Sequence, residues 1–174
     1  ALTDDWMEEN LHRPAVVGVC LIAYGVFFLL AERRRTPPRI TRAEDTDLST
    51  ALGIGLFQCL SLVPGTSRSG ATVLGGLLLG ASRTAAAEFS FLMALPTMLG
   101  ACLFRGGKLI LAGTVFTGTE TAALLTGCAV SFSVSLLVIR ALLDYVRTHT
   151  FAPFARYRMA LGAAVLLARL TGRI

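Results

Sequence analysis

Long apolar runs separated by short polar segments make up most of this chain. Four of the runs are unbroken, and their continuity argues against barrel strands, which alternate apolar and polar residues. The first run opens on Pro14, a residue that suits the first turn of a helix. Each run approaches the roughly 20 residues that cross a bilayer as a helix. The pattern predicts transmembrane helices at residues 14–31, 89–104, 121–146 and 151–170.

A fifth apolar segment is interrupted in its middle. Residues 48–63 and 71–80 are apolar, but each is short for a full crossing, and the polar sequence PGTSRSG lies between them at 64–70. Two short apolar halves around a Pro/Gly break are typical of a broken or re-entrant helix pair. Irregular backbone is tolerated at membrane depth only where it is buried in protein or lines a wet cavity. We therefore predict a re-entrant helix–loop–helix over residues 48–80.

Composition and charge place the whole chain in the membrane class. Of its 174 residues, 54% are hydrophobic and 16% charged, and the mean hydropathy is +0.67. Soluble domains are nearer 45–50% apolar and 25% charged. We expect an all-α integral membrane protein, with residues 1–174 as a single membrane domain. The net charge of +5 does not point to nucleic acid, because the arginines adjoin apolar segments.

The distribution of arginine predicts the orientation in the membrane. The loop at 31–47 is rich in arginine and is expected in the cytoplasm, whereas the acidic N-terminal residues are expected outside. The segment at 105–120 would then be an external loop. The arginines of the first loop are Arg33, Arg34, Arg35, Arg39 and Arg42.

The polar break has the chemistry of an anion site. Gly65 and Gly70 permit positive φ and close approach of a ligand. A helix starting near residue 71 would direct free N–H groups and a positive dipole end at the break. Arg68 adds a planar guanidinium that suits phosphate oxygens. Since these groups all donate, we expect a phosphate or diphosphate ligand, bound by Gly65, Thr66, Ser67, Arg68, Ser69, Gly70 and Thr72. The alternative is a packing loop, since Ser, Gly and Thr also mediate helix contacts in membranes.

Two further arginines receive different interpretations. Arg158 lies roughly 10 Å into the last predicted helix, a depth at which a charged residue usually faces a partner or ligand. An interfacial arginine that reaches back to water is the alternative, and it fits Arg156 better. Arg83 follows the second half-helix, in a predicted loop, and its removal is expected to be nearly silent.

Residues 55–101, with the motif PGxSRSxxT complete as Pro64, Gly65, Ser67, Arg68, Ser69 and Thr72, resemble the undecaprenyl-diphosphate phosphatase family. This is the bacitracin-resistance type of integral membrane phosphatase. The tail FAPFARYRMALGAA is similar to the family's last helix, with Arg158 at its functional arginine. The resemblance extends from about Pro14 to the C-terminus.

The resemblance implies hydrolysis of undecaprenyl diphosphate to undecaprenyl phosphate and inorganic phosphate, which recycles the lipid carrier for peptidoglycan precursors. It implies an inverted-topology repeat in the bacterial inner membrane, with the site open to the periplasm. Arg68 and Arg158 would clamp the diphosphate as catalytic residues, and Ser67 is a possible nucleophile that has no base within this chain. The resemblance leaves open whether the protein forms a homodimer.

One departure from the family pattern matters. The family's glutamate-rich ExxxE segment and the Ser-Ser-Thr-Gly-His stretch after it are absent here. By family length, about a third of the protein is expected to be missing at the N-terminus. The divalent cation implied by the resemblance, Mg²⁺ or Ca²⁺, would have its ligands there and none in this chain. We therefore expect this chain alone to be inactive. The rival interpretations are a transporter or flippase for an anionic lipid or solute, or a non-catalytic remnant.

Overall fold

The computed structural model describes residues 13–33, 37–113 and 116–171, and these form an all-α fold as predicted. Two short 3-10 helices, η1 (Ala43–Asp45) and η2 (Leu60–Leu62), accompany the α-helices. Across the described ranges the only extended pairing is an isolated bridge between Ile40 and Ala81. The α-helices are α2 (Pro14–Arg33), α3 (Leu48–Cys59), α4 (Arg68–Leu78), α5 (Arg83–Leu111), α6 (Gly118–Thr148) and α7 (Ala152–Leu170).

Three helices, α2, α5 and α6, are long and apolar enough to cross a membrane. Together with the composition, they identify the chain as a membrane protein. Helix α7 was also predicted to span, but it is not among the three. It has the length, at 19 residues, but it carries Arg156, Arg158 and Arg169, and charged residues are costly in a lipid-facing helix.

Helices α5 and α6 are longer than the sequence predicted. Helix α5 continues through Pro96 to Leu111, so the expected external loop at 105–120 is helical over its first residues. Helix α6 begins with a capping box: Thr117 accepts from the Glu120 backbone N–H, and the Glu120 carboxylate accepts from the Thr117 backbone N–H. Because the box satisfies two otherwise unpaired N–H groups, it starts α6 three residues before the predicted boundary at 121.

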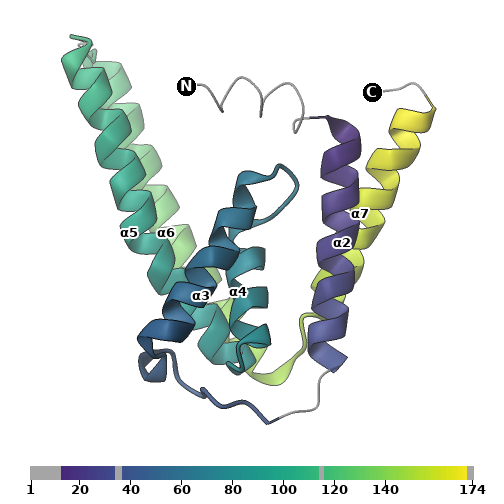
Figure 1. The fold of residues 1–174 in the computed structure, drawn as a ribbon. Coiled ribbons are helices and arrows are strands. Elements are labelled where there is room, and N and C mark those ends of the chain that lie inside the picture. Colours follow the sequence, from purple (N-terminus) through teal and green to yellow (C-terminus); the bar gives the residue numbers. More distant parts are fainter. Residues whose placement is uncertain (1–12, 34–36, 114–115, 172–174) are drawn as a thin grey trace.

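Helices α3 and α4 form a hairpin between two long helix pairs (Figure 1). The start of α3 and the end of α4 lie on the side of the molecule that carries the α2–α3 connection. The hairpin tip, at 60–67, points the other way but does not extend as far as the end of α5 and the start of α6. On one side α2 packs along α7, and on the other α5 packs along α6. The core lies where the hairpin meets these pairs, and its most buried members include Phe28, Ala71, Leu74, Ala85 and Ala155.

Glycines allow α2 and α7 to approach closely. A Cβ added at Gly18 would lie 3.2 Å from the carbonyl oxygen of Gly162, and one added at Gly162 would lie 2.7 Å from the carbonyl oxygen of Gly18. One added at Gly25 would lie 2.9 Å from the carbonyl oxygen of Ala155. Small residues of this kind let membrane helices pack backbone against backbone. The contact brings the first half of α7 against the middle of α2.

We predict that the connection between α2 and α3 faces the cytoplasm, since it carries the excess arginine. Arg34 and Arg35 lie outside the described residues, but Arg39 and Arg42 are described and exposed. In a variant whose four cysteines (Cys20, Cys59, Cys102 and Cys128) are replaced by serine, Asp45→Cys should resist a membrane-impermeant thiol reagent in intact cells. Ala112→Cys, at the C-terminal end of α5, should react. If Asp45→Cys reacted and Ala112→Cys did not, the orientation would be the opposite of the one predicted.

Candidate anion site at the helix break

The hairpin tip turns at a glycine with positive φ, as expected. Gly65 has φ +87°, and the Thr66 backbone N–H donates to the Val63 carbonyl oxygen at 3.1 Å. A Cβ on Gly65 would lie 2.7 Å from the Val17 carbonyl oxygen and 2.8 Å from Val17 Cα. Any side chain there would therefore collide with the backbone of α2. The position requires glycine for its conformation and for its closeness to α2.

Helix α4 begins earlier than the sequence predicted. Its first residue is Arg68, and Ser67 is the N-cap, whose hydroxyl accepts from the Gly70 backbone N–H at 3.2 Å. Gly70 was expected to have positive φ, but it is helical, because the cap bond starts the helix before it. Its lack of a side chain serves close packing instead: an added Cβ would lie 3.2 Å from Ser67 Cβ and 3.4 Å from Arg158 Nη1.

Arg158 reaches from α7 to this break. Its Nη2 donates to the Gly65 carbonyl oxygen at 2.8 Å, and the residue is only 4% exposed. Its guanidinium carbon lies 5.8 Å from the centre of the Tyr24 ring and 5.9 Å from that of Phe154. Arg156, by contrast, is exposed. The two arginines therefore occupy the buried and exposed positions that the sequence analysis assigned to them.

The charge of Arg158 is not balanced by a carboxylate in the described part of the chain. None of the ion pairs there involves it, and its buried Nε has no hydrogen-bond acceptor. A buried cation without a counter-charge is unfavourable by several kcal/mol. The donors that face the break include the backbone N–H groups of Ser67, Arg68 and Ser69, which have no acceptor in the described ranges. The break therefore combines a buried cation with N–H donors that have no acceptor in the described residues.

Arg68 lies at the break but contacts a different element. Its Nη1 donates to the hydroxyl of Thr97 on α5 at 3.0 Å, whereas Arg158 contacts Gly65 and the rings of α2 and α7. The hydroxyls of Ser67 and Ser69 lie 3.1 Å apart at the start of α4, and Ser69 is exposed. The structure thus brings Arg158, Gly65, Ser67 and Gly70 together, while the guanidinium of Arg68 is directed toward α5.

Thr72 is buried between α4 and α5. It is 2% exposed, and its hydroxyl donates to the carbonyl oxygens of Arg68 and Ser69 at 3.2 and 3.1 Å. It also shares a 2.6 Å hydrogen bond with the hydroxyl of Ser90 on α5. In this arrangement Thr72 joins α4 to α5 and offers no free donor to a ligand.

An apolar pocket of about 400 Å³ borders the N-terminal end of α4. Ser69 and Gly70 form one part of its wall, and Phe28, Phe91, Tyr145 and Phe154 supply aromatic surface. The polar break and this apolar pocket are adjacent, an arrangement that suits a ligand with an anionic head and an apolar tail.

The described residues do not supply a metal site. Among them no three His, Cys, Asp or Glu side chains come together, so they do not fit as the ligands of the divalent cation implied by the family resemblance, which were expected outside this chain. Ser67 likewise has no basic partner among the described residues, because its hydroxyl contacts only the Gly70 N–H and the hydroxyl of Ser69.

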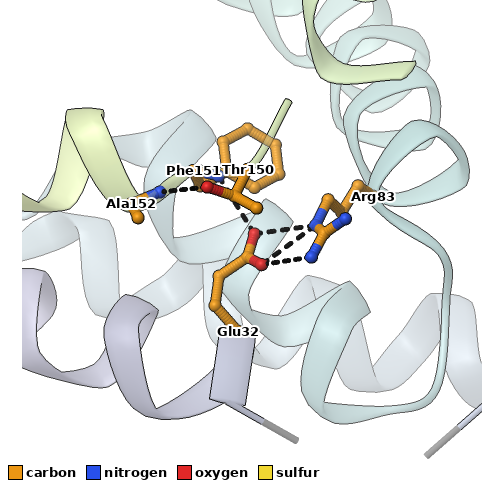
Figure 2. Close-up of polar contacts among 5 residues, drawn as sticks. All are labelled: Glu32, Arg83, Thr150, Phe151 and Ala152. Carbon is orange, nitrogen blue, oxygen red and sulfur yellow. Dashed lines mark hydrogen bonds and ion pairs between the residues drawn. The ribbon is translucent and has the colours of Figure 1, made fainter. Parts of the chain in front are cut away.

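Sequence reasoning missed an ion pair between α2 and α5. Arg83, expected in a loop, is the first residue of α5, and its guanidinium binds the Glu32 carboxylate through Nε and Nη2 (Figure 2). It also missed Tyr24, whose ring flanks Arg158. Glu32 is the only acidic residue of α2, and a lone carboxylate at the end of an apolar helix was the available signal.

Comparison with known proteins identifies the family. Residues 1–164 match the family described as bacitracin resistance protein BacA. The chain is 51% identical over 94% of its length to an undecaprenyl-diphosphatase of Lacticaseibacillus casei. It is 50% identical over 95% of its length to one of Enterococcus faecalis, and 47% identical over 94% to one of Streptococcus mutans.

The chain spans about three fifths of the length of these relatives: 61%, 60% and 59%, respectively. Because the match covers nearly all of this chain, the comparisons give no support to the prediction that it is inactive alone. Its sequence and its helix break both agree with the resemblance found in the motif. The chain belongs to the bacitracin resistance protein BacA family.

Proposed function

We propose that this chain carries the diphosphate-binding part of an enzyme that hydrolyses undecaprenyl diphosphate to undecaprenyl phosphate and inorganic phosphate. One observation supports the anion site most directly: Arg158 is buried at the helix break without a counter-charge in the described residues. The substrate and the reaction are those after which the relatives, undecaprenyl-diphosphatases, are named. The apolar pocket beside Ser69 and Gly70 has room for the part of a polyprenyl chain nearest the head group.

In the proposed complex the terminal phosphate lies at the N-terminus of α4. Its oxygens accept from the backbone N–H groups of Ser67, Arg68 and Ser69, where the helix dipole also favours negative charge. Arg158 donates from the side of α7. A water molecule attacks the terminal phosphorus and loses its proton to solvent as the bond from phosphorus to the bridging oxygen breaks. Inorganic phosphate and undecaprenyl phosphate are the products. Charge develops on the phosphoryl oxygens and on the leaving lipid phosphate, and fixed donors stabilise it.

We further propose that the enzyme resides in the bacterial inner membrane with the break accessible from the periplasm. The orientation predicted from arginine places the α5–α6 connection outside and the α2–α3 connection inside. Released lipid phosphate would then return to cell-wall synthesis, and the activity would protect against bacitracin. A homodimer is compatible with this proposal but contributes nothing to it.

The decisive experiment joins this chain to the residues of the Lacticaseibacillus casei relative that lie outside the alignment, in their native order. Phosphate release from undecaprenyl diphosphate in detergent is measured for this chimaera, for the relative and for the 174-residue chain. We expect the chimaera to release phosphate at a rate close to that of the relative. Counterflow of the lipid in vesicles without phosphate release would instead indicate a transporter. Activity of the 174-residue chain alone would show that its own residues suffice.

Arg68→Lys should reduce phosphate release by the chimaera roughly ten- to a hundredfold, the equivalent of one charge-assisted contact. Lysine keeps the charge but not the planar fork that binds two phosphate oxygens. Thr97→Val, which removes only the resting partner of Arg68, should leave the rate within about threefold. Equal rates for Arg68→Lys and the unchanged chimaera would exclude Arg68 from the diphosphate site.

A further inference from the structure

Glu32 connects the end of α2 to the starts of α5 and α7 (Figure 2). It lies in the last turn of α2, and its side chain is only 8% exposed. Its carboxylate accepts from Arg83 Nε at 2.9 Å and from Arg83 Nη2 at 2.5 Å. It also accepts from the backbone N–H of Phe151 at 3.0 Å. One carboxylate thus contacts the first residue of α5 and the N-cap of α7.

The bond to Phe151 adds to a weak cap at the start of α7, where the Thr150 hydroxyl accepts from the Ala152 backbone N–H at 3.4 Å (Figure 2). Phe151 is the N-cap residue, and it makes no side-chain cap bond. The N–H groups at the start of a helix need acceptors, and a negative charge at this end is favourable. Glu32, on α2, supplies an acceptor and a negative charge to the start of α7. The start of α7 is thereby fixed to the end of α2. The ring of Phe151 adds a contact, 5.8 Å from the ring centre of Phe28.

The position of Arg158 depends on where α7 begins. Arg158 follows Phe151 by about two helical turns, roughly 10 Å along the axis and on the same face. The backbones of α2 and α7 approach closely at their glycines, with Leu166 seated against Gly18 and Met159 against Gly25. A displacement of the start of α7 along α2 would therefore move the guanidinium of Arg158 away from Gly65 and Gly70.

We infer that Glu32, itself held by Arg83, is a positioning residue for the anion site. It fixes the register of α7 through the Phe151 N–H and thereby holds Arg158 at the break. Neither Glu32 nor Arg83 touches the proposed ligand. The effect on catalysis rests on the proposed function, whereas the effect on α7 does not.

Hydrogen–deuterium exchange of the 174-residue chain tests the geometric step without reference to activity. In Glu32→Ala, the amides of residues 151–157 should exchange at least tenfold faster than in the unchanged chain. Those of α6 near Leu136, away from Glu32, should exchange as before. Unchanged exchange at 151–157 would overturn the inference, whether or not the protein is a phosphatase.

A set of variants in the chimaera separates positioning from simple stabilisation. Glu32→Gln keeps an oxygen that can accept from Phe151 but loses the ion pair. The charge-swapped pair Glu32→Arg with Arg83→Glu restores an ion pair but leaves no acceptor on α2 for the Phe151 N–H. Glu32→Gln should therefore have the lower Tm of the two but retain the higher kcat on undecaprenyl diphosphate.

We expect the charge-swapped pair to lose kcat about ten- to a hundredfold, since displacement of a catalytic group by about 1 Å can cost this much. Its KM should change less than threefold. If the charge-swapped pair regained both the Tm and the kcat of the unchanged chimaera, the ion pair alone would matter and the assigned role of the Phe151 contact would be wrong. A chimaera without any phosphatase activity would refute the proposed function, and the exchange experiment would still decide the inference.

Discussion

Arg158→Ala is expected to lower phosphate release by the chimaera about a hundredfold or more, which corresponds to roughly 3–4 kcal/mol of transition-state stabilisation. Arg158 is the buried cation at the break, and its Nε and Nη1 have no carboxylate to neutralise them in the described chain. The fixed donor costs no reorganisation when charge develops on the leaving phosphate. The loss should appear mainly in kcat, because the contact strengthens as that charge develops.

Two variants make this result specific. Arg156→Ala removes an exposed arginine of the same helix and should leave the rate within about twofold. Arg158→Met removes the charge but keeps an unbranched side chain of comparable length, so a loss of activity cannot be assigned to an empty space between α2 and α7. Because a buried charge is unfavourable without a partner, Arg158→Met should have the same Tm as the unchanged protein or a higher one. Full activity in Arg158→Met would exclude the residue from the chemistry.

Gly65→Val is expected to abolish activity and to lower the Tm. The side chain must enter a position with φ +87°, which β-branched residues strongly disfavour. Its Cβ would also lie 2.7 Å from the Val17 carbonyl oxygen, so the hairpin tip would have to move away from α2. That movement would take the Gly65 carbonyl oxygen away from Arg158 and rotate the N-terminus of α4. Loss of rate by a factor of about a hundred or more is expected.

Gly113 provides the matched control for this substitution. It too has positive φ, +68°, but nothing lies within 4 Å of an added Cβ. Gly113→Val therefore introduces the backbone strain without the collision, and activity should be retained with a modest loss of stability. If Gly113→Val and Gly65→Val lost activity equally, the close approach of Gly65 to α2 would not be the cause. Comparison of the two variants separates the effect of the strained backbone conformation from the effect of the collision with α2.

The apolar pattern predicted helix type and approximate position because membrane helices must satisfy their backbone internally. It predicted the break at Gly65 because proline and glycine mark it directly. Helix ends were less accurate, since a local cap decides them: Ser67 starts α4 at Arg68, and the Thr117–Glu120 box starts α6 at Gly118. The TxxE signature of that box is visible in the sequence, at 117–120.

The candidate site was predictable in its composition but not in its geometry. Depth along α7 indicated that Arg158 has a partner, yet no local pattern indicates that its Nη2 meets the Gly65 carbonyl oxygen. That contact depends on the packing of α2 against α7, which brings together residues far apart in the chain. Thr72 stays a predicted ligand-binding residue, but its contacts were not predictable either. Its place in the motif suggested a ligand contact, but the direction of a helical side chain depends on register, and this register turns it toward Ser90.

The hydrogen bond between Arg68 and Thr97 fixes the height of the break along α5, and we expect Arg83 and Arg105 to mark the two faces of the membrane. By the helical rise, Thr97 lies about 21 Å along α5 from Arg83, and Arg105 lies about 12 Å beyond it. The two outer arginines are thus separated by about 33 Å, close to the thickness of the hydrocarbon layer. A diphosphate head group anchored in the leaflet on the Arg105 side would have to descend only about a third of that layer to reach Arg68. From the opposite leaflet it would have to cross about two thirds, so the leaflet nearer Arg105 offers the much smaller penalty for transferring a multiply charged head group out of water.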